Sequence, residues 1–282
     1  MATTDSGGHR RFPLAWPPCQ VKLHEFRRDV SLLGLEGKVT LITGAAAGIG
    51  AAAAAMFAAQ GATLALCDRD SAFADGDGAF RRVLDVRHGD AVSAFVAEVV
   101  ESFGRIDVMI NNAGGTFASP MLDVSPKGEA ALIAENFTQV THLVRQCVPH
   151  MPDGGSIVNV TTIEAHRAAP GFAIYAAMKA GQANLTKTLA LELAPLGLRV
   201  NALAPDAMQS EGVAALGGAL AESAVAYRTG GVPPIGHYGT PVDAAGGILY
   251  LASDLARFVT GITLHVDGGN LAACGWIRTD IP

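Results

Sequence analysis

The sequence predicts an α/β fold: a doubly wound parallel sheet of about seven strands with helices on both faces. Short apolar runs alternate along the chain with longer segments in which apolar residues recur at helical spacing. Such alternation is typical of parallel strands joined by right-handed crossover helices. A glycine-rich turn follows the first apolar run, and polar residues follow most later ones. This pattern places a ligand site at the carboxyl ends of the strands.

The first strand and the turn after it predict a site for the phosphates of a dinucleotide. Residues 39–42 read as a buried strand, and an alanine-rich helix runs on to about residue 60. The turn between them contains Gly44, Gly48, Ile49 and Gly50. Glycines let the backbone approach a pyrophosphate, and the helix N-terminus offers free N–H groups with partial positive charge. Because glycine turns also serve packing alone, the next strand decides between the two interpretations.

The second strand, residues 64–67, ends in Asp68, which favours NAD as the cofactor. Asp68 follows Gly50 by 18 residues (68 − 50), and a carboxylate at this distance can bind both hydroxyls of an adenosine ribose. Its charge also repels a 2′-phosphate, so we expect NAD rather than NADP. Arg69 weakens this preference, because a guanidinium at this rim can bind that phosphate.

The later elements follow from the same patterns. The expected strands are residues 82–84, 107–110, 157–160, 198–203 and 262–266, and the expected helices are 88–103, 124–151, 173–194 and 241–252. Only a turn or a stub of helix fits between Asp68 and Asp85. Because the carboxyl ends of parallel strands meet at one edge of the sheet, the residues after them form one cofactor site. These residues are Asp85 and Val86 near the adenine, then Asn112, Ala113 and Gly114.

Two residues of the helix at 173–194 predict acid–base chemistry. Tyr175 and Lys179 are four residues apart and share one helical face. An ammonium beside the phenol stabilises phenolate, so we expect Lys179 to lower the pKa of Tyr175. Thr162 can hydrogen-bond an oxygen held next to that phenol. Taken alone, the Tyr-x-x-x-Lys pattern more often marks an anchoring tyrosine and a solvated lysine, and the upstream motifs favour the catalytic interpretation.

Composition excludes several classes of partner. The formal net charge of −6 leaves no basic footprint for nucleic acid. No run approaches the roughly 18 apolar residues of a membrane helix. The four cysteines are scattered without a Cys-x-x-Cys pair, which indicates a reduced, cytoplasmic protein without a metal site.

Three segments lie outside the regular alternation. Residues 1–34 form an N-terminal extension that could be a solvated tail or, given its apolar residues, an arm packed on its own domain or on a second subunit. Residues 35–269 form the sheet domain, and within it 206–238 are expected to act as a lid over an apolar substrate. Residues 270–282 form a C-terminal tail.

Taken together, these motifs resemble those of the short-chain dehydrogenase/reductase family, including its 3-oxoacyl reductases and hydroxysteroid dehydrogenases. The matching positions are Thr43, Gly44, Gly48 and Gly50, Asn111 to Gly114, Asn136, Tyr175 and Lys179, Pro234 to Pro241, and Val266 to Gly269. The resemblance implies a Rossmann-like fold, reversible hydride transfer between NAD(H) and a secondary alcohol or ketone, and a homodimer or homotetramer. It assigns the nicotinamide ribose to Lys179 and a proton-relay water to Asn136. It also gives cofactor contacts to Pro205, Met208 and Ser210.

Three departures from the family pattern leave alternatives open. Threonine at 162 replaces the usual serine, which keeps the hydroxyl but stiffens the side chain. Asp206 replaces a glycine after Pro205 and brings a carboxylate towards the nicotinamide or substrate, and the segment after Asp68 is short. Glu164 and His166 either line the pocket or point to solvent. The alternatives are an NADP-dependent 3-oxoacyl reductase and a weakly catalytic NAD-binding or assembly protein.

Overall fold

The computed structural model describes residues 3–4, 10–11, 33–74, 78–152, 154–206, 208–209 and 231–275. The chain divides into residues 1–31 and 32–282. In the first unit, β1 (Thr3–Thr4) pairs antiparallel with β2 (Arg10–Arg11). The rest of the expected N-terminal arm, most of the expected lid and residues 276–282 lie outside the described residues.

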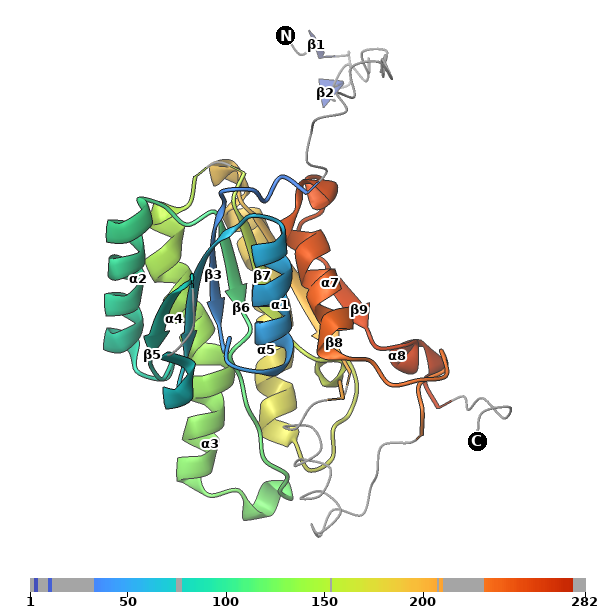
Figure 1. Cartoon of the computed structure of the whole chain (residues 1–282). Coiled ribbons are helices and arrows are strands. Elements are labelled where there is room, and N and C mark those ends of the chain that lie inside the picture. The colour runs from blue at the N-terminus through green and yellow to red at the C-terminus, as the bar shows by residue number, and fades with distance from the viewer. Residues whose placement is uncertain are drawn as a thin grey trace. The chain divides into compact units, whose positions relative to one another are not determined.

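The second unit is built on a parallel sheet with the strand order β5-β4-β3-β6-β7-β8-β9, which confirms the expected doubly wound topology (Figure 1). The strands are β3 (Val39–Thr43), β4 (Thr63–Asp68), β5 (Phe80–Val83), β6 (Val108–Asn111), β7 (Ser156–Val160), β8 (Arg199–Pro205) and β9 (Thr263–Val266). The order changes direction between β3 and β6, because the chain first builds outward to β5 and then returns. A ligand crevice forms at such a switch point.

The crossover segments contain the expected helices. They are α1 (Gly48–Ala59), α2 (Gly89–Phe103), α3 (Pro126–Ile133), α4 (Gln139–Cys147), α5 (Ala173–Glu192) and α7 (Pro241–Ala252), with a short α8 (Asn270–Ala273) after the last strand. Between β4 and β5 the described residues form a 3₁₀ turn, Ser71–Ala74, in agreement with the short spacing. None of the described helices combines the length and apolar character that crossing a membrane requires.

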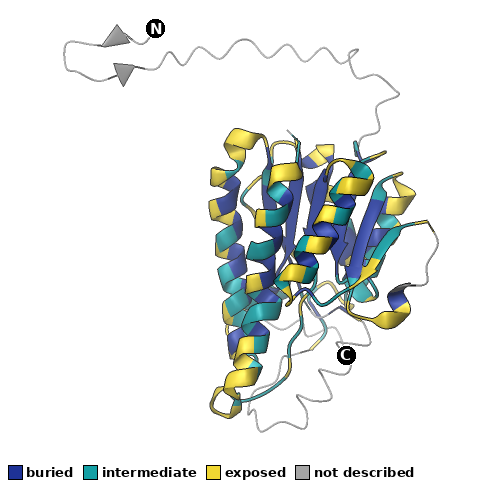
Figure 2. Ribbon diagram, turned by 90° about the vertical axis from the view of Figure 1, so that its left-hand side faces the viewer, coloured by how far each residue is buried: buried dark blue, intermediate teal, exposed yellow. Residues whose placement is uncertain are grey.

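Two apolar layers hold the helices to the sheet, one on each face. Neighbouring residues of β3 point in opposite directions, so Ile42 joins Phe57 of α1 and Ile248 of α7, whereas Leu41 joins the layer under α2, α4 and α5. Both strand faces are therefore covered, and the sheet is buried through its centre (Figure 2). Burying each large side chain of this kind contributes about 1.5–3 kcal/mol. The rigid sheet fixes where its polar strand ends lie.

Substitution of Gly50 by alanine tests the tight contact between α1 and β3. A Cβ at Gly50 would lie 2.0 Å from the Gly44 oxygen and 2.6 Å from Asn112 Nδ2, so the turn must shift. We expect Gly50→Ala to lower the free energy of unfolding by about 1–3 kcal/mol, measured by urea denaturation. Gly246→Ala is the matched control, because a Cβ there meets no atom within 4 Å. It should be neutral or stabilising by roughly 0.5–1 kcal/mol, and equal losses for both variants would contradict the packing account.

Candidate active site

The turn between β3 and α1 is pinned to the end of β6. Gly44 has a φ of +67°, and a Cβ there would lie 2.9 Å from the Ala113 Cα. Asn112 Nδ2 donates to the carbonyl oxygens of Thr43 (3.0 Å) and Gly44 (2.9 Å). The hydroxyl of Thr43 accepts from the backbone N–H of Ala113 at 3.0 Å. Asn112 and Ala113 thus shape the turn, and only glycine allows this close approach.

The outer side of this turn fits the phosphates of a dinucleotide. Gly48 has a φ of +54°, and a Cβ at this position would meet no atom within 4 Å. No side chain caps the N-terminus of α1 at Ala47, and its first turn contains no acidic residue. Free N–H groups, an open backbone and the positive end of a helix form the setting in which anions bind. The residues present therefore fit the pyrophosphate.

Asp68 lies beside the glycine turn, as the spacing predicts. Its Oδ2 accepts from the backbone N–H of Ala46 at 2.9 Å, and its Oδ1 accepts from that of Asp70 at 3.0 Å. The carboxylate is therefore oriented by the backbone of both segments that flank it. Arg69 points elsewhere, and its Nη1 lies 3.4 Å from Glu135 Oε1.

The carboxyl end of β5 carries the second acidic residue of the expected adenine site. Asp85 accepts hydrogen bonds from Arg87 Nε at 2.9 and 3.0 Å, and these bonds lower the pKa of Asp85 to about 2. Val86, between the two residues of the pair in sequence, is buried. Asp85 is thus ionised and already partnered in the protein alone.

Asn136 is buried within a π-helical segment, Ala134–Thr138, although an asparagine inside a helix is usually exposed. Its Nδ2 donates to the carbonyl oxygens of Gly115 (2.8 Å) and Leu132 (3.0 Å), and its Oδ1 accepts from the Gly115 N–H at 3.3 Å. The amide of Asn136 therefore binds the backbone at Gly115, next to the end of β6. π-Bulges occur frequently at functional sites.

Lys179 is a buried ammonium with two protein acceptors. Its Nζ donates to the Val160 carbonyl oxygen at 2.8 Å and to Gln182 Oε1 at 3.3 Å. Burial lowers the pKa of Lys179 to about 8, and the negative charge of Glu135 acts in the opposite direction. A Cβ at Gly114 would lie 3.2 Å from Nζ and 3.0 Å from Asn136 Oδ1. The backbone at Gly114 therefore lies next to both Lys179 Nζ and Asn136 Oδ1.

The electrostatics of Tyr175 correct one prediction. Burial raises its pKa to about 12, a hydrogen bond with Thr162 lowers it, and the Glu164 carboxylate raises it. The expectation that Lys179 lowers the pKa of Tyr175 is wrong for the protein without a cofactor. The ammonium lies 5.9 Å from the centre of the phenol ring, and its hydrogen bonds go to Val160 and Gln182 instead. Thr162 is next to Tyr175, as expected.

Asp206 is turned towards the end of β9. Its Oδ2 accepts from Asn270 Nδ2 at 2.5 Å, and its Oδ1 lies 3.8 Å from Arg167 Nη2. The same guanidinium binds Glu164 at 2.7 Å. Of the two alternatives for Glu164 and His166, exposure applies to His166, whereas Glu164 is half-buried. Glu164 is in an ion pair, and the exposed His166 stacks edge-on against His265 at 4.9 Å.

The remaining predicted contacts are partly described. Pro205 ends β8 and is buried. Met208 is also buried and forms an isolated bridge with Gly239. Ile49 is partly buried in the first turn of α1. Ser210 lies outside the described residues.

Sequence reasoning missed three residues of this site: Glu135, Arg167 and Gln182. Glu135 precedes the asparagine in the π-segment, and Gln182 lies one turn after the lysine on the same helical face. A signal was present for Gln182, because a polar residue at i+3 from a buried lysine is within hydrogen-bonding reach. Glu135 gave none, because its partner Arg69 comes from a distant segment. For Arg167 the local signal was its place three residues after Glu164, which it binds.

Comparison with known proteins identifies the family. The family model described as Enoyl-(Acyl carrier protein) reductase matches residues 44–270. The 3-oxoacyl-[acyl-carrier-protein] reductase FabG of Thermotoga maritima is 39% identical over 246 residues, which cover 83% of this chain and 98% of the relative. The chain belongs to the short-chain dehydrogenase/reductase family. As a member, it is an NAD(P)-dependent oxidoreductase.

Other family members include proteins with different substrates. The 3beta-hydroxysteroid dehydrogenase 1 of Eggerthella lenta is 40% identical over 188 residues, covering 66% of this chain and 71% of the relative. Aldohexose dehydrogenase from Thermoplasma acidophilum superposes with a TM-score of 0.80 at 27% identity, covering 88% of this chain and 99% of the other. The 3-ketoacyl-(acyl-carrier-protein) reductase from Brucella melitensis, solved with NADH, gives 0.75 at 32% identity, covering 84% and 99%.

The pH dependence of stability tests the burial of Lys179. With its folded-state pKa near 8 and an ordinary value of 10.5, the unfolded chain binds more protons between these values. This residue therefore makes the free energy of unfolding rise with pH above about 8. We expect the wild type to gain about 1–2 kcal/mol more than Lys179→Met between pH 7.5 and 9.5, below the ionisation of tyrosine. Urea unfolding without cofactor measures the difference, and parallel curves would show that the lysine is solvated.

Proposed function

We propose that this protein transfers hydride reversibly between NAD(H) and a secondary alcohol or ketone, with Tyr175 as the acid–base residue. The observation that carries the proposal is the meeting of Tyr175, Thr162 and Lys179 with Asn136 at the carboxyl ends of β6 and β7. These side chains come from three segments, namely α5, the residues after β7 and the π-segment. All four lie at the same edge of the sheet as the glycine turn. Bound NAD supplies the hydride acceptor, and the protein supplies position and proton transfer.

Each side chain has a task that its contacts support. Thr162 Oγ1 accepts from the Glu164 N–H at 3.3 Å, which orients the hydroxyl and leaves its proton for a substrate oxygen. Tyr175 takes the alcohol proton in oxidation and returns it in reduction. Lys179 has three N–H donors and uses two on Val160 and Gln182, so the third can hold the nicotinamide ribose. Asn136 fixes the backbone at Gly115 beside them, and we propose that it also anchors a relay water.

NAD is the proposed cofactor in preference to NADP. Asp68 supports this choice, because its carboxylate is fixed beside the glycine turn and repels a 2′-phosphate. The relative from Brucella melitensis was solved with NADH. The cofactor-binding residues that we propose are the glycine turn with Ile49, Asp68, Asp85 and Val86, the segment Asn112–Gly114, and Pro205, Met208 and Ser210.

A second candidate is the reduction of 3-oxoacyl groups carried on acyl carrier protein, with NADPH as donor. The 39% identity to the Thermotoga maritima reductase across almost its whole length favours it. Both candidates use the same acid–base residues. Turnover of a 3-oxoacyl thioester compared with cyclic and aliphatic ketones, each with NADH and NADPH, separates them.

We further propose a homodimer or homotetramer that pairs through α4 and α5. A groove of about 440 Å³ lies between these helices, with Val144, Val148, Leu185 and Leu189 among its lining residues. Its apolar walls fit a helix of a second copy better than they fit water. Light scattering during gel filtration gives the state directly.

Removing the phenol hydroxyl tests the role of Tyr175. We expect Tyr175→Phe to lower kcat at least a hundredfold, because general acid–base catalysis contributes about 10²–10⁴. Binding of NADH, followed by fluorescence, should change less than about twofold. Near-normal kcat on a good substrate would refute the assignment.

Replacing the threonine hydroxyl tests the role of Thr162. Thr162→Ser keeps the hydroxyl donor and should retain most activity. Thr162→Val leaves the substrate oxygen without its donor, and we expect the resulting loss of kcat/KM to correspond to about 1–3 kcal/mol of transition-state stabilisation. Valine has nearly the shape of threonine without the hydroxyl, so equal rates for the serine and valine variants would show that the hydroxyl has no part in the reaction.

A further inference from the structure

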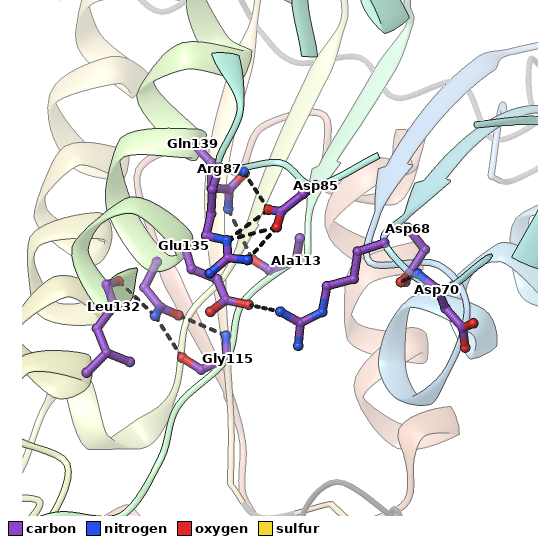
Figure 3. A network of polar contacts seen from close by, with 11 residues as sticks. Asp68, Asp70, Asp85, Arg87, Ala113, Gly115, Leu132, Glu135 and Gln139 are labelled. Atoms are coloured by element: carbon purple, nitrogen blue, oxygen red, sulfur yellow. Dashed lines mark hydrogen bonds and ion pairs between the residues drawn. The ribbon is translucent and has the colours of Figure 1, made fainter. Parts of the chain in front are cut away.

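An ion pair connects the two sides of the glycine turn. Arg69 follows Asp68 at the end of β4, and Glu135 lies in the π-segment, where its Oε1 is 2.9 Å from the position that a Cβ on Gly115 would take. Gly115 follows the end of β6, and β3 lies between β4 and β6 in the sheet. With about 4.8 Å between neighbouring strands, the Arg69–Glu135 contact bridges roughly 10 Å across the strand that carries the turn (Figure 3).

This pair decides what charge the adenosine end of the cofactor meets. Arg69 is the guanidinium that a 2′-phosphate would use, since it is adjacent to the ribose-binding carboxylate. In the structure it is paired with Glu135 across 3.4 Å, with side chains 63% and 17% exposed. The neighbouring guanidinium of Arg87 is bound to Asp85. A 2′-phosphate bound here must displace Glu135 or Asp85 from its arginine. The displaced carboxylate then remains close to the phosphate and repels it.

We propose that Glu135 is a specificity-determining residue that selects NAD over NADP by holding Arg69 away from the 2′-phosphate. The inference rests on the proposed function, since it assumes a dinucleotide on the glycine turn. Asp68 then rejects the phosphate by repulsion, and Glu135 does so by occupying Arg69, the cation next to the ribose-binding carboxylate. The π-bulge makes this possible, because it turns Asn136 inward and presents Glu135 to Arg69.

Binding measurements on purified full-length variants test the proposal without relying on turnover. Calorimetric titration with NADH and NADPH gives both affinities for the wild type and for Glu135→Gln. Because the pair is partly exposed, we expect its removal to tighten NADPH binding about three- to fivefold and to leave NADH binding within about twofold. In an Arg69→Gln background the same Glu135→Gln change should have no effect on NADPH, because the released guanidinium is missing.

The control is Glu129→Gln, which removes an equal charge from an exposed site in the first turn of α3. It should change neither affinity. Equal tightening of both cofactors by Glu135→Gln would mean that the pair hinders the whole dinucleotide and would overturn the proposal. A gain for NADPH that persists without Arg69, or no gain, would overturn it too. If the wild type binds neither cofactor, the proposed function itself fails, so the two failures are distinguishable.

Discussion

The site depends on one constraint: an ammonium must stay charged inside the protein. Lys179 is almost completely buried, and an isolated charge in that position would be very costly. The Val160 carbonyl oxygen and Gln182 Oε1 compensate part of that cost, and the Glu135 carboxylate adds a favourable field. Much of the surrounding chain serves this arrangement, since Val160 ends β7 and Glu135 lies in a distorted helix turn. The ammonium of Lys179 is thereby held at the carboxyl end of β7, close to Tyr175.

The same constraint explains why the tyrosine is a weak acid in the protein alone. Burial outweighs the hydrogen bond from Thr162 and raises the pKa of the phenol. The lysine is directed to the main chain instead of the phenol oxygen. We expect the phenol to ionise only when further positive charge and hydroxyl groups arrive with the ligand, so that the proposed base stays inactive until the site is filled. The protein therefore fixes the positions of these side chains before the cofactor binds. The charges that lower the pKa of the phenol are complete only in the proposed complex.

The fold could be read from the sequence because its signals are local. The apolar runs matched the buried strands, whereas the partly exposed edge strand β5 begins two residues before the predicted 82–84. The start and end of α7 were predicted to the residue, and its start carries a capping box between Thr240 and Asp243 with Pro241 in the first turn. The glycine turn, Asp68 and the Tyr175–Lys179 pair were also found from spacing. By contrast, the ion pairs of Glu135 with Arg69 and of Arg167 with Asp206 join segments far apart in the chain. Which carboxylate a guanidinium contacts depends on the packed structure, so the partner of Arg69 could not be predicted.

The most direct test of the account is the ionisation of Tyr175 with and without cofactor. Nuclear magnetic resonance of ring-labelled tyrosine, titrated in the free protein and in its complex with NAD, reports the phenol pKa in each state. The account predicts a value near 12 in the free protein and a fall of at least about two units in the complex, absent in Lys179→Met. An unchanged value on binding, or an equal fall without the lysine ammonium, would contradict it.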